Sequence, residues 1–236
     1  MRRTYSGRFP AAGTVPFLLL IFLGIGGRAM PLHAGDTAPL RIACVGDSIT
    51  YGLRIEDREH HNYPAVLNRL LGGGVTVLNA GVSGTTLLKQ GDYPYWHTAA
   101  FRDATAFEPD VVIIKLGTND TKFRNWKHRD DLADDLRALI DHFAELPSKP
   151  RIWICHPVPM YGLLRHLNNR TLQRELIPVI DRIAEEKDVP VIDLYSALDG
   201  APEHFPDGVH PNAEGAKRIA HAVWLAVRDE VEALKR

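Results

Sequence analysis

The chain has 236 residues, of which 45% are hydrophobic and 24% are charged, and its formal net charge is −1. This composition is typical of a globular protein and excludes a disordered chain, a collagen-like chain and a polytopic membrane protein. The near-neutral charge argues against nucleic-acid binding as the main function. Two cysteines, which do not form a Cys-x-x-Cys pair, exclude a disulfide scaffold and a cysteine-based zinc site.

The first 34 residues have the pattern of a secretory signal peptide. They contain four arginines, no acidic residue and a short apolar run, Val15–Ile25. That run is shorter than the roughly 20 residues that span a bilayer, and Ala34 is a small residue suited to cleavage. We therefore expect an exported protein, periplasmic or secreted, consisting of residues 35–236 and without stable membrane association. Its net charge would be −5, since the four arginines are lost; a retained N-terminal membrane anchor is the alternative.

The rest of the chain alternates between strand-like and helix-like segments. Short, nearly continuous apolar runs predict strands buried on both faces of a parallel sheet: 41–45, 75–79, 111–115, 151–155 and 189–192. Apolar residues at helical spacing predict helices over 63–71, 130–146, 172–186 and 212–234. This alternation predicts one doubly wound, three-layer α/β domain with about five parallel strands.

Polar and glycine-rich blocks follow several of these strands. They are Gly-Asp-Ser-Ile-Thr (46–50), Asn-Ala-Gly-Val-Ser-Gly (79–84), Gly-Thr-Asn-Asp (117–120) and Asp-Gly-Val-His-Pro (207–211). Because ligands bind at the carboxyl ends of the strands in such sheets, we expect the four blocks to meet at one edge.

Together these residue types suit acyl transfer. The Ser48 hydroxyl needs a base to become a nucleophile, and His210 is suited to accept its proton. Asp207 could fix the tautomer of that histidine from the same loop. The developing oxyanion needs hydrogen-bond donors, and the backbone N–H groups of Ser48 and Gly84 and the side-chain amide of Asn119 are available.

Each of these residues also has a purely structural interpretation. Ser48 and His210 could each be the N-cap of a helix, and Asn119-Asp120 could form an Asx turn. We assign Asp47 and Asp120 to structure, where their carboxylates would hold loops by hydrogen bonds.

In order and spacing, the four blocks resemble those of the GDSL esterases, also called SGNH hydrolases, over positions 45–211. The resemblance implies a flavodoxin-like hydrolase in which Ser48 is the nucleophile, His210 the base and Asp207 the residue that orients His210. It also implies an oxyanion hole of Ser48, Gly84 and Asn119, with no metal and no cofactor. Ile49 stands where the family name has leucine, which is a conservative difference.

The two cysteines fall in strands that are predicted to be interior. Cys44 and Cys155 should be buried thiols that behave as small hydrophobic residues. In a flavodoxin-like strand order the third strand separates them, so we expect no disulfide.

Two aromatic loops, 90–101 and 122–128, indicate the substrate class. Aromatic rings interleaved with polar groups suit sugars, so we expect Trp96, Trp126 and Tyr161 to contact substrate; the alternative is that they pack the loops themselves. The third block, with Asn125-Trp126 shortly after it, resembles the bacterial carbohydrate O-acetylesterases that act on sialate or xylan. The expected partner is therefore a small-molecule or glycan ester.

Other functions remain open at this point. A lysophospholipase, thioesterase or arylesterase of the same family would use the same catalytic residues on different acyl groups. A metal-dependent phosphoesterase or a catalytically silent glycan-binding module would use the same edge of the sheet differently.

Overall fold

The computed structural model of the protein describes residues 38–162 and 166–235, so the predicted signal peptide lies outside the described residues. The sheet has five parallel strands in the order β2-β1-β3-β4-β5. The strands are β1 (Leu40–Gly46), β2 (Val75–Gly81), β3 (Val111–Lys115), β4 (Arg151–Cys155) and β5 (Val191–Ile192). The helices are α1 (Ser48–Tyr51), α2 (Arg58–His61), α3 (Tyr63–Leu71), α4 (Ala99–Ala106), α5 (Phe123–Trp126), α6 (Leu132–Ala144), α7 (Asn169–Thr171), α8 (Ile177–Lys187), α9 (Leu194–Leu198) and α10 (Ala213–Leu234).

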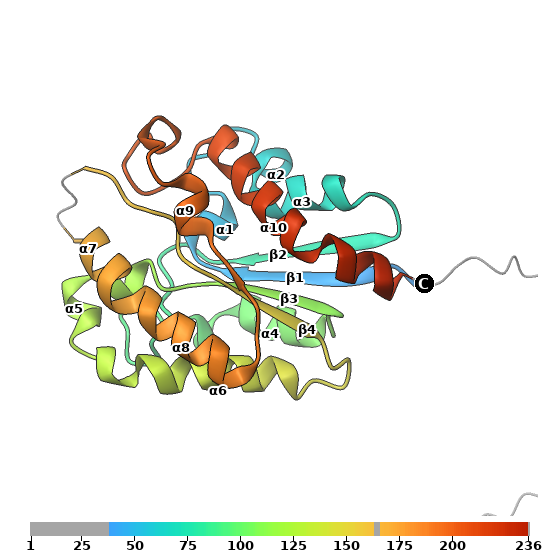
Figure 1. Cartoon of the computed structure of the whole chain (residues 1–236), viewed down its shortest axis with the longest axis horizontal. Helices are drawn as coiled ribbons and strands as arrows, with labels where there is room; N and C mark the ends of the chain where they lie inside the picture. The colour runs from blue at the N-terminus through green and yellow to red at the C-terminus, as the bar shows by residue number, and fades with distance from the viewer. Residues whose placement is uncertain (1–37, 163–165, 236) are drawn as a thin grey trace, which may run out of the picture. The chain divides into compact units, whose positions relative to one another are not determined.

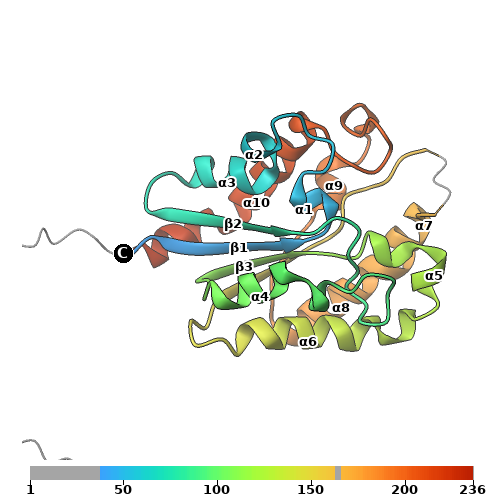
Figure 2. The same cartoon turned by 180° about the vertical axis from the view of Figure 1, so that it is seen from behind.

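Helices cover both faces of this sheet, which makes three layers (Figures 1 and 2). On one face, Ile42 and Cys44 of β1 pack against a cluster from α1, α3, α9 and α10. On the other face, Ala43 and Val45 of the same strand pack against α4, α6 and α8. Because successive side chains of a strand point to opposite faces, a strand between two helix layers must be apolar throughout. The predicted single α/β domain with five parallel strands is confirmed.

The strand order places a topological switch point between β1 and β3. The chain leaves β1 toward β2 and then returns to β3 on the other side of β1. In register, Gly46 at the end of β1 pairs with Gly81 of β2 and with Lys115 of β3. The three strands therefore end side by side, at the edge of the sheet where ligands bind in open α/β folds.

Most element boundaries agree with the expectations, and two differences have a clear physical cause. The strand expected over 189–192 is reduced to β5, since Pro190 has no N–H to donate to a ladder. The helix expected over 172–186 begins with a π-helical turn at Leu172–Leu176 and continues as α8. Pro178 in the first turn of α8 cannot donate to the regular ladder, which accounts for the wider turn before it.

Candidate active site

Ser48 is the first residue of α1, directly after β1. Asp47 occupies the N-cap, and its Oδ1 accepts a hydrogen bond of 2.9 Å from the backbone N–H of Ile49. The helix cap is therefore Asp47, and the interpretation of Ser48 as an N-cap is wrong. Gly46 lets this turn form, because a Cβ there would lie only 2.0 Å from Oγ1 of Thr50.

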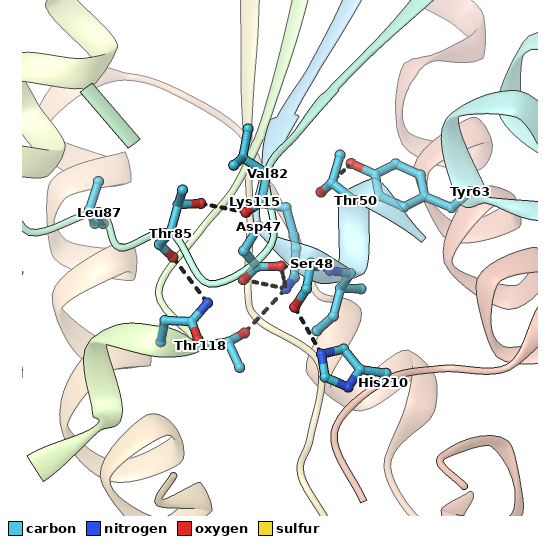
Figure 3. Close-up of polar contacts among 12 residues, drawn as sticks. Asp47, Ser48, Thr50, Tyr63, Val82, Thr85, Leu87, Lys115, Thr118 and His210 are labelled. Carbon is cyan, nitrogen blue, oxygen red and sulfur yellow. Dashed lines mark hydrogen bonds and ion pairs between the residues drawn. The ribbon is translucent and has the colours of Figure 1, made fainter. Parts of the chain in front are cut away.

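A chain of hydrogen bonds joins Ser48 to the loop before α10. The Ser48 hydroxyl lies 2.9 Å from Nε2 of His210 (Figure 3), and Nδ1 of that ring lies 2.7 Å from Oδ2 of Asp207. The N-cap of α10 is Asn212, whose Oδ1 accepts from the backbone N–H of Gly215, so the N-cap interpretation of His210 is also wrong. The structure thus brings Ser48 next to His210, which is 162 positions later in the chain, and His210 next to Asp207.

Asp207 is held as a charged carboxylate. Partial burial acts to raise its pKa, but hydrogen bonds from the backbone and ring of His210 and from the backbone of Val209 outweigh it, and the pKa falls to about 2. Nε of Arg54 also lies 2.8 Å from Oδ2 of this carboxylate. An anion at this position favours the tautomer with a proton on Nδ1, which leaves Nε2 free to accept one from Ser48.

The candidate oxyanion donors lie on three segments at the same edge. Asn119 is buried, and its Nδ2 donates a hydrogen bond of 3.0 Å to the carbonyl of Thr85, next to Gly84. Gly84 has φ of +88°, and the nearest atom to a Cβ built there is Cδ1 of Tyr93 at 3.9 Å, so the space at its Cβ position is open. The N–H of Ser48, in the first turn of a helix, has no acceptor within that helix.

A buried ion pair connects the Ser48 segment to the Asn119 segment (Figure 3). Nζ of Lys115 lies 3.0 and 3.1 Å from the two carboxylate oxygens of Asp47 and 3.2 Å from Oγ1 of Thr118. The Lys115 and Asp47 side chains are both 0% exposed. Sequence reasoning assigned a structural role to Asp47 but missed Lys115, whose signal was a charge at the end of an otherwise apolar buried strand.

Asp120 fixes the loop that carries Gly84. Its two carboxylate oxygens accept hydrogen bonds from the backbone N–H groups of Leu87 (3.1 Å) and Leu88 (2.8 Å), in agreement with the structural role that we assigned to it. Complete burial raises the pKa of Asp120 from 3.8 to about 6, although these hydrogen bonds act in the opposite direction.

This raised pKa predicts a pH-dependent stability. Between about pH 4 and 6 the folded chain holds a proton on Asp120 that the unfolded chain has released, so the free energy of unfolding falls as the pH rises through this window. We expect the free energy of unfolding of the wild type, relative to an Asp120→Asn variant, to fall by about 2–3 kcal/mol from pH 4 to pH 6.5. Urea denaturation of both proteins across this range measures it, and a constant difference would contradict the prediction.

The three aromatic residues expected to contact substrate bind other parts of the chain. Nε1 of Trp96 donates to the carbonyl of Leu87, and Nε1 of Trp126 lies 3.3 Å from a carboxylate oxygen of Glu175. The Tyr161 hydroxyl donates to the carbonyl of Leu198. All three rings pack against the hydrophobic clusters. Their contact with substrate stays a prediction.

Cys44 and Cys155 are buried free thiols on β1 and β4, with β3 between the two strands. Burial raises the pKa of Cys44 to about 12 and raises the pKa of Cys155 as well.

Within residues 38–162 and 166–235, no group of three or more His, Cys, Asp or Glu side chains is arranged to hold a metal ion. None of the helices in the described part of the chain is long and apolar enough to cross a membrane.

Comparison with known proteins finds relatives that are named as esterases and thioesterases. The chain is 36% identical over 228 residues to the acetylxylan esterase of Xylanibacter ruminicola, a match that covers 89% of this chain and 47% of that protein. The chain thus spans about half the length of that curated relative. It is 25% identical over 224 residues to thioesterase 1/protease 1/lysophospholipase L1 of Escherichia coli K12, covering 90% of this chain and 89% of that protein.

A solved structure shares the fold. A carbohydrate acetylesterase family member from Sinorhizobium meliloti superposes with a TM-score of 0.65 at 21% identity, covering 82% of this chain and 99% of that one. Residues 44–218 match the GDSL-like lipase/acylhydrolase family. Because this match runs from β1 into α10 and includes all four sequence blocks, the chain belongs to the GDSL-like lipase/acylhydrolase family.

Proposed function

We propose that the chain is a serine esterase that removes short acyl groups, acetyl above all, from carbohydrates. The observation that carries this proposal is the hydrogen-bonded series Ser48 Oγ, His210 Nε2, His210 Nδ1 and Asp207 Oδ2, with successive distances of 2.9 and 2.7 Å between residues. A hydroxyl, an imidazole and a charged carboxylate in this order form the arrangement that activates a serine for acyl transfer.

In the proposed reaction, His210 accepts the hydroxyl proton as Oγ of Ser48 bonds to the ester carbonyl carbon. The carbonyl oxygen becomes an oxyanion, which the N–H groups of Ser48 and Gly84 and the amide of Asn119 stabilise. The tetrahedral intermediate then collapses, and the leaving sugar oxygen takes the proton from His210. A water molecule next gives its proton to His210 and attacks the acyl group on Ser48. Collapse of this second intermediate returns the proton to Oγ and releases the carboxylic acid.

Replacing Asn119 tests the oxyanion assignment. We expect Asn119→Ala to lower kcat by about 10²–10³, because the variant loses a donor aimed at charge that develops only in the transition state. Steady-state kinetics on 4-nitrophenyl acetate measures this. Asn68→Ala is the matched control: its Oδ1 accepts from the backbone N–H of Val77 at the junction of α3 and β2, so its loss should affect stability and leave kcat intact. Equal kcat values for Asn119→Ala and wild type would contradict the assignment.

A carbohydrate substrate is supported by the 36% identity to an acetylxylan esterase across 89% of the chain. The direct test is a panel of acetylated xylan, acetylated sugars, and 4-nitrophenyl esters from acetyl to octanoyl. We expect release of acetate from the polysaccharide and a steep fall in rate from acetyl to butyryl. Activity abolished by EDTA and restored by zinc or manganese would overturn the serine mechanism.

A lysophospholipase or thioesterase activity is the second candidate, since the E. coli enzyme of that name matches this chain over 89% of its own length. That activity requires a site for a long acyl chain. A preference for octanoyl or longer esters in the same panel would favour it over the acetylesterase.

We also propose that the protein is exported, with cleavage after Ala34. The basic start and the short apolar run of residues 1–34 support this, and acylated polysaccharides lie outside cells. N-terminal sequencing of the protein from the periplasm or medium of an expressing bacterium tests it. A full-length chain retained in the cytoplasm would contradict it.

A further inference from the structure

Two aromatic side chains near the candidate active site are exposed to solvent. Phe123 is 93% exposed and Tyr93 is 46% exposed, and they are the two aromatic residues among the large exposed hydrophobic side chains of the described residues. They lie on the same two loops as Trp96 and Trp126, whose rings pack against the protein. Tyr95 and Phe101 of these loops pack against the same cluster, so Tyr93 and Phe123 are the two aromatic residues of the loops that are exposed.

Tyr93 borders the backbone of Gly84. Its Cδ1 is the nearest atom to a Cβ built on Gly84, at 3.9 Å, so the ring borders the open space on the Cβ side of Gly84. The backbone at Tyr93 is fixed, because its carbonyl accepts a hydrogen bond of 2.9 Å from the N–H of Thr86. A substrate that occupies this open space beside Gly84 would contact the Tyr93 ring.

Phe123 follows the candidate oxyanion donor Asn119 closely in the chain. It begins α5, four residues after Asn119, so the two Cα atoms are at most about 14 Å apart. Phe123 lines a cavity of about 320 Å³ together with Lys122, Arg124 and His166. An apolar ring beside cationic and hydrogen-bonding groups suits a ligand that presents C–H surfaces to the ring and hydroxyl groups to the polar side chains.

A buried hydrogen-bond network ties the two loops to each other and to Asn119. The backbone N–H of Asp92 donates to Oδ1 of Asn125 at 2.8 Å, while Nδ2 of Asn125 donates to Asp92 Oδ1 at 2.7 Å and to the carbonyl of Asn119 at 2.8 Å. Lys122 and Arg124, which flank Phe123, both form ion pairs with the Asp92 carboxylate. Asp92 directly precedes Tyr93, so this network fixes the loop segments that carry both exposed rings before substrate arrives.

We propose that Tyr93 and Phe123 form a sugar-binding platform, on which the pyranose rings flanking the acylated unit of an oligosaccharide stack. This inference rests on the proposed function and names the part of the substrate that confers specificity. The occupant is a saccharide rather than a lipid, because each ring adjoins charged residues in the chain: Asp92 precedes Tyr93, and its ion-pair partners Lys122 and Arg124 flank Phe123. An acyl chain would need a continuous apolar lining. Sugar rings offer their C–H faces to aromatic rings and their hydroxyls to charged groups beside them.

The test uses Tyr93→Ala, Phe123→Ala and the double variant. For each single variant we expect kcat/KM on acetylated xylo-oligosaccharides to fall about 10-fold more than kcat/KM on 4-nitrophenyl acetate, mainly through KM. Leu225→Ala is the matched control, since Leu225 is a 50% exposed hydrophobic residue on α10, and it should leave both activities at the wild-type level. An equal loss on both substrates would overturn the platform.

A binding measurement separates failure of the platform from failure of the esterase proposal. Calorimetric titration of the wild type with unacetylated xylohexaose requires no catalysis. We expect binding by the wild type and by Ser48→Ala, and binding weakened at least 10-fold in the double variant. Wild-type affinity in the double variant, or no binding by the wild type, would overturn the platform. Saccharide binding by a wild type that hydrolyses no ester would instead retain the platform and overturn the esterase.

Discussion

Ser48→Ala is expected to lower kcat by about 10³-fold or more while leaving the fold intact. The reaction loses its nucleophile, and the residual rate would come from the oxyanion donors and substrate binding alone. The fold should persist because Asp47, not Ser48, caps α1. Alanine also favours the helical conformation that Ser48 adopts.

Two measurements check this prediction. Kinetics on 4-nitrophenyl acetate gives the loss in kcat, and urea denaturation should give a free energy of unfolding within about 1 kcal/mol of wild type. Ser148→Ala serves as the control, since it removes a buried hydroxyl that has no hydrogen-bond partner among residues 38–162 and 166–235. A Ser48→Ala protein that retains the wild-type rate would contradict the assignment.

Lys115→Met is expected to lower the free energy of unfolding by about 3–5 kcal/mol. Methionine fills a similar volume but leaves the carboxylate of Asp47 fully buried without its cation. Removal of one partner of a buried pair is far more destabilising than replacement of both, because the remaining charge keeps its desolvation penalty. For a chain whose total stability is about 5–15 kcal/mol, this loss is a large fraction.

Comparison of variants measures how much the ion pair between Lys115 and Asp47 contributes to stability. In urea denaturation at pH 7, the double variant Asp47→Asn/Lys115→Met should be more stable than Lys115→Met, since no uncompensated charge remains. Arg137→Met is the surface control: its ion pairs with Glu186 and Asp134 are exposed to solvent, so we expect a change below about 1 kcal/mol. Equal stability of Lys115→Met and wild type would show that this pair does not stabilise the fold.

The strands of the sheet could be predicted because they lie between two helix layers, whereas their order was expected only from the flavodoxin-like fold. Residues 111–115 are buried throughout, which is the reason that their apolar run stands out in the sequence. Short helices such as α1, α5 and α9 could not be predicted, since four or five residues contain little periodicity. The helix over Ala99–Ala106 was also missed; it buries little more than Ala104, so its apolar stripe is weak.

The candidate site could be predicted in part for a different reason. Polar blocks after apolar strands must meet where parallel strands end, so Ser48 and Asn119 could be placed at one edge without coordinates. The residues that form ion pairs with Asp207 and Asp47 could not be found from the strand pattern. The contact of Arg54 with Asp207, and that of Lys115 with Asp47, depend on tertiary geometry that leaves no local pattern. Likewise, the sequence does not distinguish the packed ring of Trp96 from the exposed ring of Phe123.

The central claim is that Ser48 becomes acylated, and covalent labelling tests it most directly. The protein is treated with a fluorophosphonate, and intact-mass and peptide mass spectrometry locate the adduct. We predict one adduct per chain, on Ser48, with loss of esterase activity in proportion to labelling and no adduct on the Ser48→Ala variant. An adduct on another residue that accompanies the loss of activity, or full ester hydrolysis by a chain that carries no adduct, would contradict the claim.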